Sequence, residues 1–450
     1  MSTKLDKYSE FLNTKVKRDV ATGISGHFDI NPNLFDFQRS LVLWAVKRGR
    51  AAIFAFTGAG KNAMAPEWAN IITKKVGGKA IIFEPLGVIG GAIEEAKEIL
   101  GLDIKHVYSK ADLDDKHTLF ITNYERMEKF DSEDFTAVVL DEASILKGFD
   151  GQTRNYFIDN WSSVPFRLVS TATPAPNDYM ELGNYSEFLG IMDYHEMLGS
   201  FFTHCSENTS KWILKGHAAK RFWEWMAGWS VTLTSPSDLG YDDSDYLLPP
   251  LNLVQISVKT DSSVPVANTL QERLQVRRMT TEIRCQEAAN LVLNDPDKIW
   301  LIWTNLNLES TRMKQLIPWA VEVKGADKPE YKEKMIKDFS HGKIKCLVTK
   351  CLIAGMGCNL QVCNNMIFVG LSDSAEQVYQ GTRRIWRFGQ KNEVNSYHVV
   401  SDKEGAVVEN LKRKEKQMEE MQKELIEFTK EINSKNIRMA SRENDYYDPQ

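Results

Sequence analysis

Short, continuous apolar segments recur along the chain and predict two sheets in tandem. The first series comprises residues 51–55, 80–83, 118–121, 137–140 and 167–170. The second series comprises residues 299–303, 321–323, 344–348, 366–369 and 397–400. Because neighbouring positions are apolar, rather than every second one, each segment fits a strand that is buried on both faces, as in a parallel sheet covered by helices. We therefore predict an α/β fold with two parallel-sheet lobes.

Other segments divide the chain around these lobes. Residues 34–46 and 403–437 have apolar positions spaced mostly by three and four, which is typical of helices. The expected organisation is an N-terminal arm at 1–30, a first lobe at 31–190, a helical insertion and linker at 191–255, a second lobe at 256–402, and a C-terminal amphipathic helix with an acidic tail at 403–450.

The expected insertion is rich in aromatic side chains that lie among lysines and arginines. These aromatic residues are Trp212, Phe222, Trp223, Trp225 and Trp229. Such a pattern can stack on nucleic-acid bases. Helically spaced tryptophans more often belong to a hydrophobic core, and we favour that interpretation.

Composition excludes several classes of protein. The chain of 450 residues, 42% hydrophobic and 26% charged, is long enough for two cores. It has no apolar run of the roughly 18 to 20 residues that a membrane span requires, and its N-terminus lacks the apolar core of a signal peptide. Its six cysteines form no close C-x-x-C pair, which argues for reduced thiols and against a zinc site. We expect a cytoplasmic protein, and the net charge of −5 neither indicates nor excludes a nucleic-acid partner.

A glycine-rich loop follows the first predicted strand. It reads Thr57, Gly58, Ala59, Gly60, Lys61 and Asn62. A glycine loop between a buried strand and a helix turns backbone N–H groups toward an anion, and a lysine at its end adds a positive charge. The second glycine and the lysine match the usual phosphate loop, whereas Asn62 stands where that loop has a hydroxyl. The alternative is a plain glycine turn.

Polar residues follow the strands of the first series. Asp141 and Glu142 come directly after one of them. Because ligands bind beyond the carboxyl ends of parallel strands, we expect these tips to converge on the glycine loop. An acidic residue there can hold Mg²⁺ beside a nucleotide, and a neighbouring glutamate can position water. Alone, an acidic pair that closes a strand is common.

Two further sites carry groups that suit a nucleotide. Gln38, about twenty residues before the loop, could pair with the N6 and N7 edge of adenine, although an exposed helix glutamine explains the residue equally well. Arg384 and Arg387 are three residues apart, on one face if that segment is helical. Guanidinium groups suit γ-phosphate oxygens; a basic helix face is the alternative.

With these segments in order, the chain resembles the superfamily-two helicases, and more closely the Swi/Snf-type DNA translocases in the compact form found in phages and bacteria. The similarity covers about residues 34–400. It includes residues 57–62 for motif I, 85–86 for motif Ia, 121–125 for the next strand-end motif, 140–147 for motif II, 170–174 for motif III, 302–305 for motif IV, 349–360 for motif V and 380–390 for motif VI. The last two are the most specific, since Arg-x-x-Arg-x-Gly-Gln separates this group from other helicases.

The resemblance implies two tandem RecA-like lobes and a nucleic-acid-stimulated ATPase that uses ATP and Mg²⁺. It implies that Gln38 reads adenine and that Lys61 binds phosphates. It also implies that Asp141 holds Mg²⁺ and that Glu142 positions water. It makes Arg384 and Arg387 arginine fingers, and it extends the nucleotide contacts to the loop and to Gly357. It places Thr122, Asn123, Thr349, Lys350 and Asn359 along the nucleic-acid track, with backbone contacts that are independent of sequence.

The partner implied is DNA, duplex more than single-stranded DNA or RNA, in a bacterial or phage-infected cytoplasm. The C-terminal helix could pack on the lobes, pair with a protein partner as a coiled coil, or extend along DNA, and we favour packing on the lobes. Two other functions stay open: a strand-separating helicase, and an ATP-dependent DNA-binding switch. Asn62 makes the switch plausible, because an amide oxygen is a bulkier and differently aimed ligand for Mg²⁺ than a hydroxyl. Since the other catalytic residues are retained, we expect a slower or conditionally active ATPase rather than an inactive one.

Overall fold

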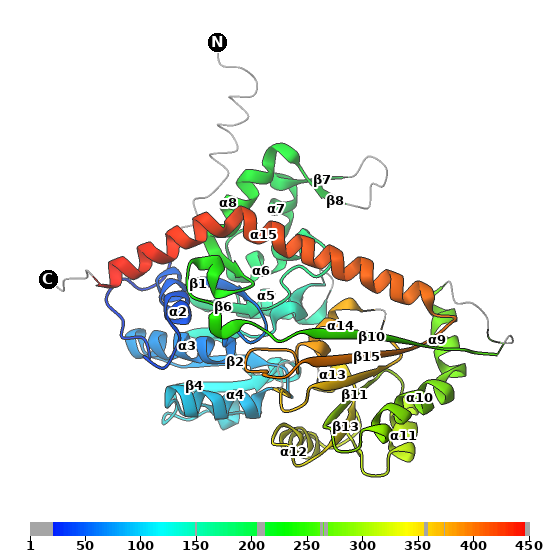
Figure 1. The fold of residues 1–450 in the computed structure, drawn as a ribbon. Coiled ribbons are helices and arrows are strands. Elements are labelled where there is room, and N and C mark those ends of the chain that lie inside the picture. Colours follow the sequence, from blue (N-terminus) through cyan, green and yellow to red (C-terminus); the bar gives the residue numbers. More distant parts are fainter. Residues whose placement is uncertain are drawn as a thin grey trace. The chain divides into compact units, whose positions relative to one another are not determined.

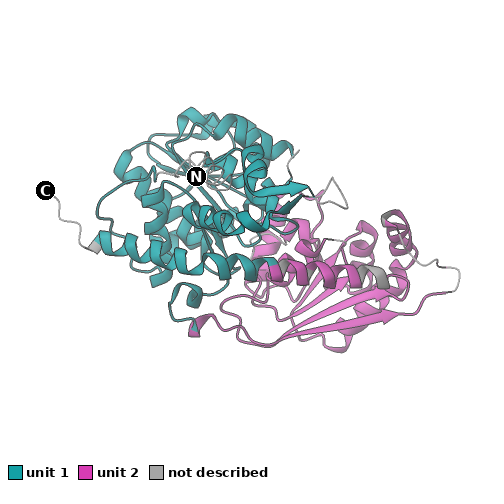
Figure 2. Ribbon diagram, turned by 90° about the horizontal axis from the view of Figure 1, so that it is seen from above, with its two compact units in different colours: residues 1–243, 421–450 teal, residues 244–420 magenta. Residues whose placement is uncertain are grey.

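The computed structural model describes residues 21–148, 151–204, 212–261, 264, 269–354, 359–372 and 374–445. It divides into two compact units (Figure 2). The first unit comprises residues 1–243 and 421–450, and the second comprises residues 244–420. Most of the predicted N-terminal arm and most of the acidic tail lie outside the described residues.

The described strands of the first unit form a seven-stranded parallel sheet in the order β3-β4-β2-β5-β6-β1-β9 (Figure 1). The strands are β1 (Arg50–Ala55), β2 (Ala80–Glu84), β3 (Lys105–His106), β4 (Leu119–Asn123), β5 (Ala137–Leu140), β6 (Phe166–Thr171) and β9 (Ser230–Leu233). β1 lies between β6 and β9, and β5 lies between β2 and β6. The glycine loop after β1 and the acidic pair after β5 therefore leave the same edge of the sheet.

Helices alternate with these strands. They are α2 (Asp36–Arg48), α3 (Lys61–Val76), α4 (Ile89–Glu95), α5 (Gln152–Trp161), α6 (Leu182–Leu189), α7 (Tyr194–Phe201) and α8 (Ala219–Trp229). A short antiparallel hairpin, β7 (Phe202–His204) with β8 (Trp212–Leu214), follows α7. On α8, Phe222 and Trp229 are fully buried and Trp223 and Trp225 nearly so, which confirms the core interpretation for these aromatic residues.

The described strands of the second unit form a six-stranded parallel sheet in the order β10-β15-β14-β11-β13-β12. The strands are β10 (Leu251–Val258), β11 (Trp300–Thr304), β12 (Val321–Glu322), β13 (Cys346–Thr349), β14 (Asn365–Val369) and β15 (Val394–Ser401). The helices are α9 (Leu270–Met279), α10 (Thr281–Asn294), α11 (Asn307–Leu316), α12 (Pro329–Ser340), α13 (Cys351–Ala354) and α14 (Ala375–Thr382).

The sheet of the second unit is buried on both faces. Along β11, Leu301 and Trp303 belong to one hydrophobic cluster, whereas Trp300 and Ile302 belong to another. Alternate side chains of a strand point to opposite faces, so the continuous apolar segment reflects two cores rather than one. The predicted pair of parallel-sheet α/β lobes is confirmed.

Besides the hairpin of β7 and β8, two strands of the parallel sheets fall in the segment 191–255 that the sequence suggested to be a helical insertion and linker. β9 joins the edge of the first sheet beside β1, and the residues of β10 before 256 pair with β15. β9 has four residues and directly follows α8, so its hydrophobic pattern is too short to be distinguished from the end of the helical pattern. β10 is a half-exposed edge strand, so it lacks the continuous apolarity of the central strands.

The helix α15 (Gly405–Asp445) ends the described chain and runs for about 60 Å at 1.5 Å per residue. Met421 and Leu425 lie in the hydrophobic core of the first unit, so this part of the helix packs on its lobe as predicted. The helix continues beyond the predicted end at 437, because Asn444 exchanges hydrogen bonds with the backbone of Phe28.

Candidate functional site

The glycine loop joins β1 to α3 and has the backbone of an anion cradle. Gly58 and Gly60 have φ of +94° and +82°, values that a side chain disfavours. Gly60 is the N-cap of the 16-residue helix α3, whose first N–H groups lack partners within the helix. Thr57 and Ala59 are buried on either side of Gly58. The loop therefore brings backbone donors and a helix N-terminus to one place.

Lys61 opens α3 and turns back to the strand that it follows. Its Nζ donates to the carbonyl oxygens of Ala55 at 3.0 Å and Phe56 at 3.2 Å. Lys61 is buried, and its charge opposes the rise in pKa that burial and the charge of Glu142 cause at Asp141. Its ammonium group thus lies between the end of β1 and the acidic pair.

Asn62 stands where the usual loop has a hydroxyl, and its side chain bonds to a residue of α4. Its Nδ2 donates to Glu95 Oε2 at 3.3 Å. Because the amide nitrogen points to Glu95, the amide oxygen is the atom that remains for a cation. Asn62 is half-buried.

Gln38, on α2, supports the loop directly. Its Nε2 donates to the carbonyl oxygen of Ala59 at 2.8 Å, and its Oε1 accepts from the backbone N–H of Phe35 at 3.0 Å. A side chain at Gly60 would come within 2.2 Å of Gln38 Nε2, so the glycine leaves space for the amide. An amide has a second N–H and a second lone pair, so adenine recognition stays a prediction.

Asp141 and Glu142 follow β5 and are both buried. Ser170 Oγ donates to Asp141 Oδ1, and Tyr124 OH donates to the Asp141 carbonyl at 2.6 Å. Burial, reinforced by the charge of Glu142, raises the pKa of Asp141 to about 6, although Lys61 and Ser170 act in the opposite direction. Glu142 has φ of 48° and ψ of 45°, and it is the one non-glycine residue with positive φ in the described chain. Such a conformation costs about 1–3 kcal/mol and is typical of functional sites.

Glu84, at the end of β2, is one of the polar strand ends expected near the glycine loop, but the sequence interpretation gave it no role in the site. The side chain is 1% exposed, and neither carboxyl oxygen has a hydrogen-bond partner among the described residues. Burial raises its pKa well above the ordinary value, and the charges of Asp141, Glu95 and Glu142 add to this. β2 pairs with β5 so that Phe83 lies beside Leu140, which sets Glu84 next to Asp141. An acidic residue at the end of a fully buried strand was the available signal.

The donor set suits Mg²⁺ held jointly with a nucleotide. The described residues contain no cluster of three His, Cys, Asp or Glu side chains that could hold a metal alone. Mg²⁺ in nucleotide sites uses one or two protein oxygens, with phosphates and water completing the shell. The Asp141 carboxylate and the Asn62 amide oxygen would supply these two protein oxygens. The buried carboxyl groups around them also favour the binding of a cation.

Thr122 and Asn123, at the end of β4, are buried. The hydroxyl of Thr122 has no hydrogen-bond partner in the described structure, and Asn123 Nδ2 donates to Glu125. Both residues lie at the carboxyl edge of the first sheet. Their contact with nucleic acid stays a prediction.

In the second unit, Arg384 and Arg387 lie after α14 rather than on it. The helix ends at Thr382, so the two arginines do not share a helix face. The carbonyl of Arg384 accepts from the backbone N–H of Leu360 at 3.0 Å. Arg384 is 2% exposed, and its Nε donates to the Gln380 carbonyl at 3.0 Å. Arg387 is half-buried.

The remaining predicted residues of the second unit lie around β13. Thr349 is fully buried and donates to the Val323 carbonyl at 3.1 Å. Lys350 is half-buried and Asn359 is exposed. Gly357 lies outside the described residues. The role of these residues at a nucleic-acid track stays a prediction.

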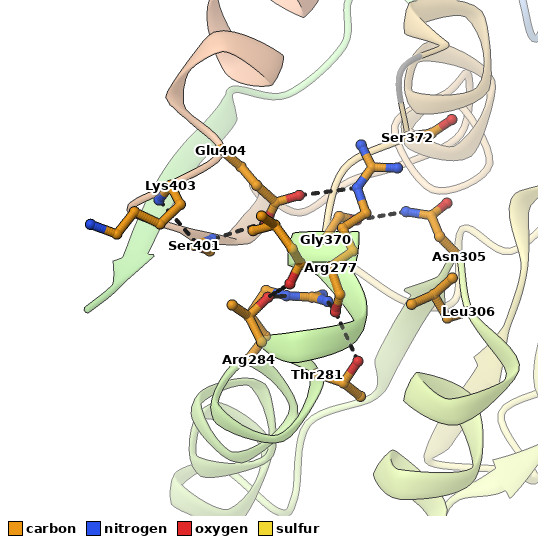
Figure 3. A network of polar contacts seen from close by, with 12 residues as sticks. Arg277, Thr281, Arg284, Asn305, Leu306, Gly370, Ser372, Ser401, Lys403 and Glu404 are labelled. Carbon is orange, nitrogen blue, oxygen red and sulfur yellow. Dashed lines mark hydrogen bonds and ion pairs between the residues drawn. The ribbon is translucent and has the colours of Figure 1, made fainter. Parts of the chain in front are cut away.

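A buried network of ion pairs lies beyond the ends of β11, β14 and β15 (Figure 3). Arg284 and Glu309, both fully buried, approach to 2.7 Å. Arg277 Nε donates to Glu404 at 3.0 Å, and Arg284 Nη2 donates to the Arg277 carbonyl at 2.6 Å. Asn305, from the predicted motif IV, donates through Nδ2 to the Gly370 carbonyl at 3.0 Å. The sequence interpretation missed this network, because its members are far apart in the chain.

Comparisons with known proteins identify part of the second unit. Residues 303–389 match the family model of the helicase conserved C-terminal domain. The match spans β11 to the predicted motif VI and confirms the helicase resemblance for this region. A search of curated proteins finds no match.

A solved structure, the Sulfolobus solfataricus SWI2/SNF2 ATPase core in complex with dsDNA, is similar at 15% identity and a TM-score of 0.42. The similarity covers 93% of this chain and 98% of that one. No helix in the described part of the chain is both long and apolar enough to cross a membrane.

Proposed function

We propose that this chain, whose second unit carries a helicase conserved C-terminal domain, is a Swi/Snf-type superfamily-two motor that hydrolyses ATP to move along duplex DNA. One observation carries the proposal. The left-handed glycine loop, Lys61 and the buried pair Asp141 and Glu142 lie together at the carboxyl edge of one parallel sheet. A chain with a helicase C-terminal domain that also has this combination meets the chemical needs of phosphoryl transfer.

Each residue has a role in this proposal. The loop N–H groups and the Lys61 ammonium bind the β- and γ-phosphates. Asp141 and the Asn62 oxygen hold Mg²⁺, which neutralises charge on the phosphates when it is bound. Glu142 orients the attacking water. Lys61 donates to two neutral carbonyl oxygens, so phosphate binding exchanges those two hydrogen bonds for ones in which the acceptor is charged as well as the donor.

The second unit supplies Arg384 and Arg387 to the same reaction. Their guanidinium groups stabilise charge as it develops on the γ-phosphate. Thr122 and Asn123 of the first unit, with Lys350 and Asn359 of the second, contact the DNA backbone. Alternation between closed and open states moves the protein along the duplex.

The test is a phosphate-release assay without nucleic acid and with single-stranded DNA, duplex DNA, branched DNA or RNA. We expect duplex DNA to stimulate turnover most. Glu142→Gln should retain ATP and lose turnover by about 10²-fold or more, because the water is no longer oriented. Unchanged hydrolysis in Glu142→Gln would refute its role, and equal stimulation by RNA would refute the duplex preference.

A second candidate function is an ATP-dependent DNA-binding switch with slow turnover. The hydrogen bond from Asn62 to Glu95 favours it, because the amide is engaged outside the phosphate loop. We expect Asn62→Thr to raise kcat several-fold, since a threonine hydroxyl binds Mg²⁺ and leaves Glu95. Turnover only in Asn62→Thr would establish the switch for the natural chain, whereas equal kcat would show that the amide oxygen serves as well.

A further inference from the structure

The C-terminal helix contacts the turn that follows β6 through one polar side chain. Gln422, on α15, donates from Nε2 to the carbonyl oxygen of Ala172 at 3.1 Å. Ala172 is buried, and Gln422 is half-buried. Both residues belong to the first unit. A segment 250 residues distant in sequence therefore holds a backbone group within the predicted motif III.

A short path leads from Ala172 to the acidic pair. Ser170, two residues before Ala172, donates its hydroxyl to Asp141 Oδ1. Thr171 Oγ1 accepts from the backbone N–H of Thr173 at 3.2 Å, which closes the turn around Ala172. Ser170 and Thr171 are both buried. Only Thr171 separates the Ala172 turn from Ser170, so a displaced Ala172 carbonyl would act on the last residues of β6, where the Ser170 hydroxyl bonds to the Asp141 carboxylate.

The helix does not need Gln422 in order to dock. Met421 and Leu425, on either side of it, lie in the hydrophobic core. Phe428 stacks on Trp223 with ring centroids 5.4 Å apart and an interplanar angle of 7°. Tyr179 OH donates to Glu424 at 2.6 Å. These contacts fix the helix next to the turn, so an apolar residue at 422 would be compatible with docking.

We propose that Gln422 is a positioning residue for the nucleotide site, which holds the Ala172 carbonyl so that Ser170 keeps Asp141 in the orientation that binds Mg²⁺. The C-terminal helix is then part of the site rather than a cover for the hydrophobic core. The expected effect of Gln422 on turnover rests on the proposed ATPase function, whereas its effect on the conformation of the turn at Ala172 does not.

Two variants remove the donor, and a third is a matched control. Gln422→Met keeps the length of the side chain, and Gln422→Glu keeps its shape but offers no N–H. Lys423→Met places the same new residue at the neighbouring exposed position. Hydrogen exchange of the full-length protein, measured by mass spectrometry, reports on residues 168–175 and 140–146.

We expect exchange in both segments to be about fivefold faster in the two Gln422 variants than in Lys423→Met, as loss of one hydrogen bond predicts for local opening. We also expect kcat to fall about fivefold and the Mg²⁺ concentration for half-maximal turnover to rise, with the affinity for fluorescent ATP in the absence of Mg²⁺ unchanged within twofold. A lower kcat with unchanged ATP affinity indicates a positioning role, because a general loss of folding would lower both.

Two results would overturn the inference. Exchange equal to that of Lys423→Met in both segments would show that Gln422 does not hold the turn. Faster exchange throughout residues 421–445 would show that Gln422 serves docking instead. If the natural chain had no ATPase activity, the proposed function would fail, while the exchange measurement would still decide the positioning role.

Discussion

Two clusters of buried charge lie at strand ends, one in each unit, and they differ in how the charge is balanced. In the second unit, Arg284 meets Glu309 and Arg277 meets Glu404, so each buried charge has an opposite partner. In the first unit, Glu84 and Asp141 are buried near other carboxylates, and the pKa of each is raised. Balanced charge stabilises a unique arrangement, whereas unbalanced charge is expected where a cation or a nucleotide binds.

The largest expected effect comes from breaking the balance in the second unit. Arg284→Met leaves the Glu309 carboxylate buried without its partner, and we expect a loss of about 3–5 kcal/mol in the free energy of unfolding. Denaturation by urea measures it. The double variant Arg284→Met with Glu309→Gln should recover part of the loss, because the uncompensated charge is gone. A loss below 1 kcal/mol in the single variant would show that the pair is not buried as described.

In the first unit, replacing Glu84 is expected to raise the free energy of unfolding, by less than Arg284→Met lowers it. The pKa of Glu84 is raised in the folded state, so its proton favours folding. That stability is fully present below the unfolded pKa of about 4.5 and is lost as the pH rises toward the folded value. Glu84→Gln does not titrate, and we expect it to be more stable than the natural chain by about 1–3 kcal/mol at pH 8.

Thermal unfolding between pH 4 and pH 8 tests the Glu84 prediction. The difference between Glu84→Gln and the natural chain should be smallest at pH 4 and should grow with pH. Asp141, whose pKa is raised from 3.8 to about 6, adds a fall in stability over that interval in both proteins. A difference that does not vary with pH would contradict the raised pKa of Glu84.

The smallest expected effect concerns the backbone of Glu142. Asparagine tolerates the left-handed region better than other non-glycine residues. Glu142→Asn should therefore raise the free energy of unfolding by about 1 kcal/mol and should also abolish turnover. Equal stability would indicate that the conformation stores no strain. In the network of the second unit, the buried Glu309 does not have a positive φ, so Glu309→Asn relieves no backbone strain. We expect that variant only to lower the free energy of unfolding.

The sequence predicted the central strands well because their apolarity is continuous. β5 begins and ends at the predicted residues 137 and 140, and most other predicted strands lie within two residues of their observed ends. The polar residues that follow them include Asp141 and Glu142, which the structure brings close to Lys61. Parallel strands share one carboxyl edge, so strand order was not needed for that prediction.

What could not be predicted depends on contacts between distant segments. Glu84 was expected at the polar end of a strand near the glycine loop, but its burial beside Asp141 without a hydrogen-bond partner for its carboxyl in the described part of the chain could not be predicted. Arg384 and Arg387 have helical spacing, yet the helix stops at Thr382, and the Arg384 carbonyl bonds to Leu360, a residue outside the helix. The hydrogen bond from Gln422 to Ala172 has no trace in local sequence.

The first unit is built from two segments that are far apart in the sequence, and this affects how it folds during synthesis on the ribosome. Residues 421–445 complete a core whose other members lie before residue 230, and Asn444 pairs with Phe28 near the start of the described chain. Domains fold as the chain emerges, N-terminal part first. The first unit therefore cannot complete its core until all of the second unit has been translated. Until then, the surface around Trp223 that α15 covers stays exposed. A chain that stops early would keep this apolar surface exposed and would be a substrate for chaperones and proteases.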